Sequence, residues 1–372
     1  MTQPLRPRDE ADLAELIAST RGPLEPVAGG SKRAIGRPVD AQRLDLALLS
    51  GVVDYEPDEL VLTAAAATPL AEVEALLAAR GQRLVFEPPQ LEALLDVRAA
   101  PTLGGTLAAN ACGSRRFAVG AARDHFLGFR AVNGRGERFK AGGRVVKNVT
   151  GYDLPKLLAG SWGTLAVLTE VSVRVHPMPE CQHTLLVPTA EVEHAARMLA
   201  RSVALPCEVT GAAFVPGRGV CLRLEGFETS VKARAQQLLE ALGQPQHTRL
   251  QQADSAALWR QISGVSTLAD MPIVWRIALP PADLPRLLRA LAPARYLVDW
   301  AGGLLWVGAA EANGADVRDA LQAGHATLIK APPSVRANTA VFGPLPAPLA
   351  SLAARLKAAF DPAGRLNPGR MS

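Results

Sequence analysis

Residues 101–116 read PTLGGTLAANACGSRR, and this stretch decides how the rest of the chain is interpreted. Gly and Ala dominate it, so its surface carries little side-chain bulk. Glycine lets a backbone approach a ligand closely, and a large flat group could therefore lie here against main-chain N–H groups. Asn110, Ser114 and Arg116 add polar groups. A tight glycine-rich turn between core elements is the alternative, and the residues alone do not decide between the two.

A second glycine loop lies upstream, at PVAGGSKRAIGRP (26–38). Its spacing matches neither a Walker loop nor the GxGxxG dinucleotide motif. The consecutive small residues of 28–32 could still form a nest of N–H groups that binds an anion such as pyrophosphate. Ser31 and Lys32 would add donors. A plain surface turn is the other interpretation of this loop.

Composition excludes several classes of protein. The chain has 372 residues and is 48% hydrophobic, which is ample for a sizeable core. Its formal charge is +5. Its basic residues are dispersed, so we predict no nucleic-acid partner. The four cysteines show no CxxC spacing and the six histidines no HExxH, so no metal site is predicted. The absence of a signal peptide or a long apolar run favours a cytoplasmic chain without a membrane span.

The first half of the chain reads as a mixture of short strands and helices. Apolar spacing predicts a helix over 9–19, and Thr68 is expected to cap a helix that begins at Pro69. Residues 129–143 alternate about an Asn-Gly pair, which predicts a β-hairpin. The nearly continuous apolar run 165–175 predicts a buried strand that ends before Pro177.

Residues 180–345 show a different pattern, in which a βαββα unit occurs twice. This order predicts a ferredoxin-like or doubled ferredoxin-like domain, a sheet with helices over one face. A closing amphipathic helix is expected over 347–359, followed by FDPAGRLNPGR (360–370).

Five motifs, in this order, resemble FAD-linked oxidases of the vanillyl-alcohol oxidase and p-cresol methylhydroxylase type: PVAGGSK, TLGGTLAANACGSRR, RDHFLG, KNVTGYDLPKLLAGSWGTLAVLTE and FDPAGRLNPGR. Within this family they are most similar to the FAD-binding subunits of bacterial glycolate oxidase (glycolate dehydrogenase). The resemblance covers essentially the whole chain. It implies an α+β fold with a two-part FAD-binding domain over 1–178 (subdomains about 1–90 and 91–178), a ferredoxin-like cap over 179–345, and a C-terminal segment 346–372 that returns to the flavin.

The same resemblance implies which residues hold FAD. The glycine loop would wrap the pyrophosphate, the second motif would line the flavin and diphosphate, and residues 163–168 would hold the adenine end. The residues implied are Val27, Ala28, Gly29, Gly30, Ser31, Lys32, Pro101, Thr102, Leu103, Gly104, Gly105, Ala108, Asn110, Gly113, Ser114, Arg116, Arg123, Asp124, Gly128, Gly163, Ala166, Leu168 and Asn367.

The sequence departs from the family pattern at three places. Ser31 stands where covalent members carry a histidine, and Ala100 where bicovalent members carry a cysteine, so non-covalent FAD is expected. The strand and turn LVDWAGGLLWVG (297–308) lacks the histidines that catalytic 2-hydroxy-acid members supply from the cap. Cys112 is at the wrong position for a flavin linkage and is expected to be a small buried residue.

Two residues are weak catalytic candidates. Arg276 lies in an apolar run, where a buried cation is costly unless paired, so it could bind a carboxylate or face water. Tyr152 lies beside the flavin motifs. No residue is assigned as a catalytic base.

The resemblance implies one of two functions. The first is the FAD-binding subunit of a glycolate oxidase complex, which oxidises glycolate, a small 2-hydroxy acid, to glyoxylate and passes electrons to an iron–sulfur subunit. The alternative is a non-catalytic FAD-binding, electron-relay or structural subunit whose paralogue does the substrate chemistry. Both imply a second FAD-linked subunit and an iron–sulfur subunit as partners, with attachment to the membrane only through them. Trp300 and Trp306 are expected either at that interface or in the core.

Overall fold

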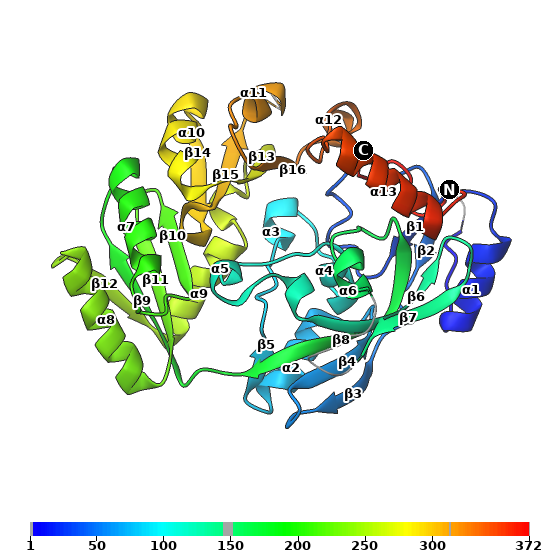
Figure 1. The fold of residues 1–372 in the computed structure, drawn as a ribbon, viewed down its shortest axis with the longest axis horizontal. Helices are drawn as coiled ribbons and strands as arrows, with labels where there is room; N and C mark the ends of the chain where they lie inside the picture. Colours follow the sequence, from blue (N-terminus) through cyan, green and yellow to red (C-terminus); the bar gives the residue numbers. More distant parts are fainter. Residues whose placement is uncertain (1–2, 144–151, 312–313, 372) are drawn as a thin grey trace.

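The computed structural model describes residues 3–143, 152–311 and 314–371. Its first part is built on a sheet with strand order β3-β4-β8-β6-β7, in which β5 also pairs with β8 (Figure 1). A separate parallel pair, β1 and β2, lies beside it. The strands are β1 (Leu24–Val27), β2 (Gln42–Asp45), β3 (Val52–Glu56), β4 (Val61–Ala65), β5 (Gln82–Leu84), β6 (Phe126–Asn133), β7 (Arg138–Gly142) and β8 (Ala166–Pro177).

Helices pack on this sheet through apolar stripes. Leu13 and Ile17 of α1 are fully buried, and Leu70, Val73 and Leu77 are the buried positions of α2. The helices of this part are α1 (Glu10–Ser19), α2 (Leu70–Ala78), α3 (Glu92–Leu95), α4 (Leu103–Ala108), α5 (Arg116–Val119) and α6 (Leu154–Leu158).

The predicted hairpin is confirmed, because β6 and β7 pair antiparallel around residues 134–137. The cap predicted for α2 is wrong. Pro69 holds the capping position without a side-chain bond, and the Thr68 hydroxyl bonds instead with the backbone of Gly51 and Ala65. Asp153, by contrast, accepts a bond from the N–H of Lys156 and caps α6. Residues 147–151 of the fourth motif lie outside the described part of the chain.

The second part is one eight-stranded sheet of order β12-β9-β11-β10-β14-β15-β13-β16. Two βαββα units, joined where Phe214 of β10 pairs with Val298 of β14, build it as the sequence predicts. The strands are β9 (Cys181–Val187), β10 (Gly211–Val215), β11 (Gly219–Gly226), β12 (Thr248–Gln251), β13 (Ile273–Ala278), β14 (Arg295–Asp299), β15 (Leu304–Ala309) and β16 (His325–Lys330).

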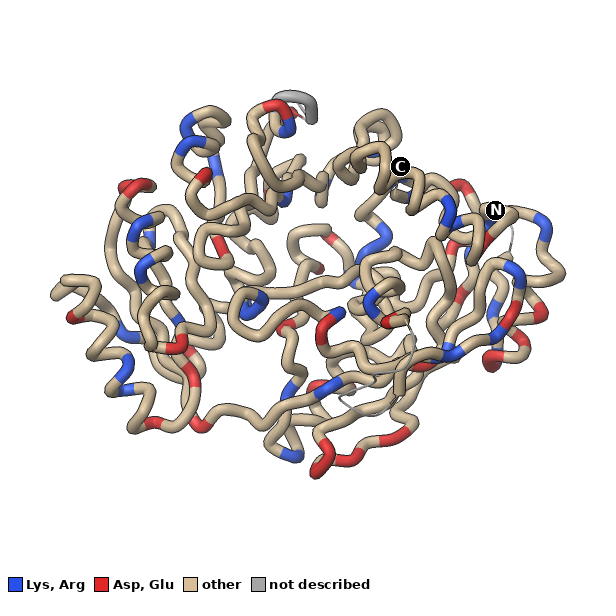
Figure 2. The backbone as a smooth tube through the Cα atoms, in the orientation of Figure 1, with Lys and Arg blue, Asp and Glu red and all other residues tan. Residues whose placement is uncertain are grey.

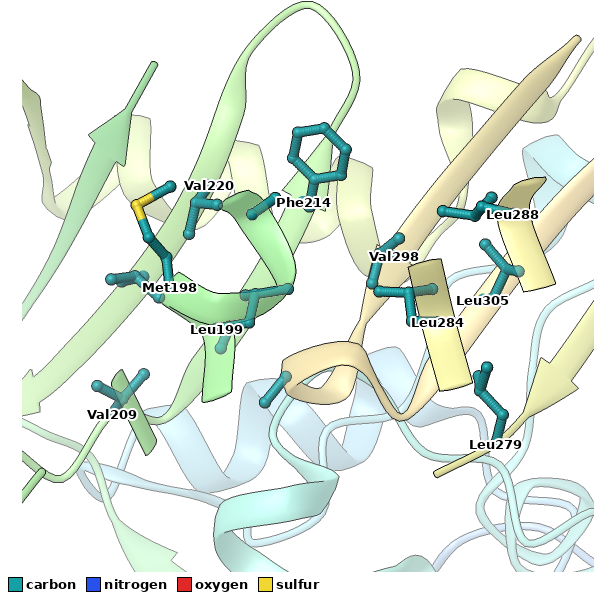
Figure 3. Close-up of a cluster of buried hydrophobic side chains, with 14 of the residues drawn as sticks. Met198, Leu199, Val209, Phe214, Val220, Leu279, Leu284, Leu288, Val298 and Leu305 are labelled. Carbon is teal, nitrogen blue, oxygen red and sulfur yellow. The ribbon is translucent and has the colours of Figure 1, made fainter. Parts of the chain in front are cut away.

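Both faces of this sheet are covered, which differs from the prediction of helices on one face. The helices α7 (Val192–Ala204), α8 (Glu228–Leu242), α10 (Leu284–Leu291) and α11 (Gly314–Asp319) pack on one face. Met198 and Leu199 of α7 meet Phe214 and Val220 there (Figure 3). The opposite face packs against α9 (Gln252–Ser263), which the sequence analysis did not predict, and against α3 of the first part. The sequence pattern could not reveal that α3 belongs to this layer, because α3 lies far away along the chain.

Buried ion pairs join the two parts. Glu87 binds the guanidinium of Arg223 at 2.8 and 3.1 Å, and Glu225 binds that of Arg115 at 2.6 and 3.1 Å. Arg83 adds a bond of 2.7 Å to Glu225. Removing one member of such a pair would leave a buried charge unpaired, at a cost of roughly 3–5 kcal/mol. The network therefore fixes how the eight-stranded sheet sits on the first part.

The C-terminal segment returns to the start of the chain. After α12 (Pro333–Asn338), α13 (Ala347–Phe360) runs along the outside of the molecule (Figure 1). Leu24 of β1 then pairs with Leu366. No residue of α13 is buried, and Leu349 and Leu352 are 53% and 48% exposed. The predicted helix is confirmed. Phe360 at its end packs on Phe139 with 5.8 Å between the ring centres, whereas Leu349 and Leu352 remain exposed.

Candidate functional site

A narrow groove runs between the glycine loop after β1, the N-terminal end of α4 and the start of β8. The loop turns through Gly30 at φ 85°, and the Thr102 hydroxyl accepts a bond from the N–H of Gly105, which fixes the start of α4. Many residues implied by the resemblance line this groove: Val27, Ala28, Gly29, Gly30, Ser31, Lys32, Thr102, Gly104, Gly105, Ala108, Gly163, Ala166, Leu168 and Asn367. The structure thus brings together segments more than 300 residues apart.

Lys32 is a cation without a counter-ion among the residues that the structure describes. Of these residues, only Thr106 brings a polar atom within hydrogen-bond distance of the Lys32 Nζ, its hydroxyl at 3.4 Å. Burial lowers the pKa of Lys32 to about 8, and Glu92 offsets this only in part. An ammonium group that has lost its hydration and has no carboxylate partner gains from an anion. Lys32 and the N–H groups of its loop therefore fit a diphosphate.

Asn367 closes the groove from the C-terminal segment. It has a positive φ of 45°, and its Nδ2 donates to the carbonyl of Trp162 at 2.9 Å. Its Oδ1 is buried and has no hydrogen-bond partner among the described residues. Arg370 lies over the Trp162 ring at 5.7 Å and donates to the carbonyl of Lys32 at 3.0 Å. The free Oδ1 is an acceptor that an N–H group of a cofactor could satisfy.

The groove opens into a cavity of about 1050 Å³ at the boundary with the eight-stranded sheet. Lys32, Trp162, Asn367 and Arg370 line both, so the two spaces are continuous. Lys and Arg are interspersed with Asp and Glu over the backbone (Figure 2), but no Asp or Glu of the described chain lines this cavity. Its cations are Lys32, Arg116, Arg276, Lys357 and Arg370.

Arg276 faces the cavity and not the solvent. Its guanidinium lies 4.8 Å from the ring centre of Trp300 and 5.9 Å from that of Trp306. Burial and the charge of Arg116 lower the pKa of Arg276 to about 10. Asn110 and Arg116, from the second motif, line the same cavity.

Other predicted residues lie away from both spaces. Gly113 accepts a bond from the indole of Trp300 at 2.9 Å, and Ser114 donates to Asp299 at 2.7 Å, so both hold the cap part. Leu103 is core, and Pro101 accepts a bond from the N–H of Leu70.

Three further predicted residues, Arg123, Asp124 and Gly128, have structural contacts within the first part. Asp124 accepts a bond from Ala121 at 2.8 Å, and the N–H of Arg123 donates to Asn110. A Cβ on Gly128 would come within 2.7 Å of the Gly143 nitrogen, so its close contact is with backbone. The other catalytic candidate, Tyr152, is 93% exposed, and the structure does not bring it to the cavity.

Sequence reasoning missed several lining residues, among them Ser161, Trp162, His325, Thr327 and Arg370. Trp162 has a φ of 55°, a strained value for a bulky residue, but its GSWG context signals only a turn. His325 comes from the last strand of the sheet, where no motif marks it. Only the fold places these residues together.

Two expectations about individual side chains need correction. Trp306 is 5% exposed, so it is a core residue and its placement at an interface is wrong. Trp300 is half-buried and faces the cavity, and its place at an interface stays a prediction. Cys112, expected to be a small core residue, lines the cavity, where burial raises its pKa although Arg116 and Arg276 favour the thiolate.

The part of the chain that the structure describes shows neither a cluster of metal ligands nor a helix that could span a membrane. Its His, Cys, Asp and Glu side chains form no group of three or more that could hold a metal ion. None of its helices combines the length and the apolar character needed to cross a bilayer.

Comparisons with known proteins agree with this geometry. A family profile described as "FAD binding domain" matches residues 3–142. Glycolate oxidase subunit GlcE of Escherichia coli (strain K12) is 38% identical over 359 residues, which cover 95% of this chain and 93% of that protein. Glycolate oxidase subunit GlcD of Bacillus subtilis (strain 168) is 32% identical over 149 residues, 40% of this chain and 31% of that protein.

Among solved structures, an alkyldihydroxyacetonephosphate synthase superposes with a TM-score of 0.70 and 16% identity, covering 99% of this chain and 77% of that one. At this identity the match shows the fold alone. Together with the family profile, it confirms the α+β class and the two-part FAD-binding domain joined to a cap.

Proposed function

The chain belongs to the FAD-linked oxidoreductase family that includes the glycolate oxidase subunit GlcE, and on this premise we propose that it is the FAD-binding subunit of a glycolate oxidase complex. In that complex it takes part in the oxidation of glycolate to glyoxylate and passes electrons to an iron–sulfur subunit. We place the complex in the cytoplasm, with any membrane attachment supplied by its partners. Domain boundaries at 178/179 and 345/346 are part of the proposal.

One observation carries it: a groove that fits a diphosphate is continuous with a large cavity lined by cations and by no described carboxylate. A dinucleotide needs the first space, and an anionic hydroxy acid needs the second. Because Lys32 and Arg370 stand where the two spaces meet, they would face both ligands.

The residues that would hold FAD follow from the groove. Lys32 and the N–H groups of its loop would bind the diphosphate, Gly105 leaves open backbone on the groove side, and Asn367 offers its unpaired Oδ1. When bound, FAD accepts a hydride from the carbon that bears the hydroxyl of the substrate. We propose non-covalent binding, since Ser31 and Ala100 offer no histidine or cysteine at the linkage positions.

The alternative, a subunit that holds FAD without meeting substrate, has one observation in its favour. Among the described lining residues, His325 is the histidine that could act as a base. Burial and the charges of Arg276 and Arg116 lower its pKa, which makes it a weaker base. No described carboxylate in the lining could take the hydroxyl proton in its place.

Anaerobic titration of the isolated, FAD-loaded chain with glycolate tests the choice. Loss of the flavin absorption band supports a catalytic subunit. If the band persists in the isolated chain but is lost in the assembled complex, the relay role replaces the catalytic one. A chain that does not retain FAD at all would overturn both.

A further inference from the structure

Two guanidinium groups from distant parts of the chain meet on one indole ring in the cavity wall. Arg116, at the start of α5, and Arg276, on β13, lie 4.7 and 4.8 Å from the ring centre of Trp300. Thr327 of β16 and Cys112 line the same wall. Like charges repel, so such a pair persists only where the surrounding structure enforces it.

The Trp300 turn is what enforces it. Trp300 and Ala301 both have left-handed backbone angles, with φ of 51° and 54°, a conformation that is strained for residues other than glycine. Two bonds hold the turn to the second motif: the Trp300 indole donates to Gly113, and Ser114 donates to Asp299. Asp299 also accepts a bond from the Trp300 N–H at 2.7 Å. Consecutive strained residues that are held this firmly indicate a functional constraint.

Neither guanidinium has a carboxylate partner among the described residues. Within the described chain, Arg116 reaches only the Cys112 sulfur as an acceptor, at 4.0 Å, and Arg276 has its contacts with the two tryptophan rings. Asp299, the carboxylate whose charge acts on Arg276, has its two oxygens occupied by Ser114 and the Trp300 N–H. Buried cations are normally paired, so the missing partner is expected to be a ligand.

We propose that Arg116 and Arg276 form a binding site for the carboxylate of a small organic acid, and that Trp300 is the positioning residue that holds the pair together. The site takes a monocarboxylate or dicarboxylate of a few carbons, because two forked guanidiniums match a planar carboxylate. This inference rests on the proposed function for the identity of the acid, but not for the site itself.

Isothermal titration calorimetry with oxalate, a carboxylate that has no C–H bond to oxidise, tests the site in the full chain with and without FAD. We expect Arg116→Ala and Arg276→Ala each to weaken oxalate binding by about ten-fold or more, since each removes a charge-assisted hydrogen-bond donor. Arg289→Ala is the matched control, because Arg289 is exposed and pairs with Glu193 on the outer surface of the cap. It should bind oxalate like the wild type.

The role of Trp300 is read from two variants. Trp300→Leu keeps both arginines but removes the ring, and should weaken oxalate binding several-fold through lost cation–π contacts. Trp300→Phe restores an aromatic face and should recover most of the affinity. Equal melting temperatures of the variants exclude unfolding as the cause.

The outcomes separate this inference from the proposed function. If the wild type binds oxalate and both arginine variants bind it equally well, the site is refuted while FAD binding stands. If the wild type binds no carboxylate, the site is refuted as well. If oxalate binds through the arginines in a chain that cannot load FAD, the site stands and the proposed function fails. If Trp300→Leu binds like the wild type, the positioning role is wrong.

Discussion

Replacing Lys32 with Met should change the stability of the FAD-free chain and the affinity for FAD in opposite directions. Burial lowers the pKa of Lys32 from 10.5 to about 8. This difference corresponds to at most about 3 kcal/mol of folding free energy, which the folded chain loses when the ammonium group stays charged. Met fills a similar volume without a charge. We therefore expect K32M to leave the FAD-free chain equally stable or more stable, although a buried polar contact is lost.

FAD binding should respond in the other way. A diphosphate beside Lys32 replaces lost hydration with charge-assisted hydrogen bonds worth about 1.5–3 kcal/mol, so K32M should raise the Kd for FAD by roughly 10- to 150-fold. The pKa of Lys32 then rises on binding, so FAD binding takes up a proton above pH 8. Wild-type affinity should fall as the pH increases from about 8 to 10, and K32M affinity should fall less.

Fluorescence titration of the FAD-free chain, with chemical denaturation of the same samples, measures both quantities. Because unfolding raises the pKa of Lys32, the unfolded chain holds more protons than the folded chain between pH 8 and 10.5. The free energy of unfolding of the wild type, relative to that of K32M, should therefore increase with pH over that range. Lys140→Met, on the β7 hairpin strand, is a control for loss of one positive charge. Equal FAD affinity in K32M and the wild type at every pH would refute the diphosphate assignment.

Three further outcomes follow from the structure. Gly105→Leu should lose flavin, measured as the 450 nm absorbance of purified protein, because a side chain there would enter the groove beside Thr102; full loading would show that the groove is not the cofactor site. Burial raises the pKa of Asp299 to about 7, so wild-type stability relative to Asp299→Asn should fall as the pH rises from about 4 to 7 and then level off; thermal melts showing a constant difference would contradict this. If α13 is the docking surface for the iron–sulfur subunit, the double variant Leu349→Glu with Leu352→Glu should abolish co-purification of iron with the chain and leave the flavin content unchanged. The control variant Phe227→Glu, at a 75% exposed position of the cap, should still co-purify with iron. Iron retained by the α13 variant would exclude that helix as the docking surface.

The sequence predicts elements well where the local pattern determines them. The β6–β7 hairpin follows from its Asn-Gly turn, and the two βαββα units follow from alternating apolar runs. The prediction that Thr68 caps α2 is wrong for a local reason. Its hydroxyl accepts a bond from the N–H of Gly51 and donates to the carbonyl of Ala65, and both residues lie outside that helix. Propensity cannot register such competition between near neighbours in space.

The cofactor groove could be anticipated only through its motifs. Lys32 and Gly105 lie in recognisable loops, and both line the groove. Gly113 and Ser114 belong to the same motif but bind the cap at Trp300 and Asp299, because the chain turns away from the groove between Asn110 and Gly113. A motif marks a segment, and the fold decides which of its residues face the ligand.

The cavity wall shows why the rest could not be predicted. Arg116, Arg276 and His325 come from α5, β13 and β16, and no spacing in the sequence relates them. They converge because the ion pairs of Glu87 and Glu225 fix the eight-stranded sheet against the first part. The carboxylates of this network bind Arg223, Arg115 and Arg83, and neither Glu87 nor Glu225 lines the cavity. Among the described lining cations, Lys357 pairs with Asp361 and Arg370 lies 3.8 Å from Glu25, whereas Lys32, Arg116 and Arg276 have no carboxylate partner. These three are therefore the positive charges left for the phosphates of the cofactor and for an acid substrate.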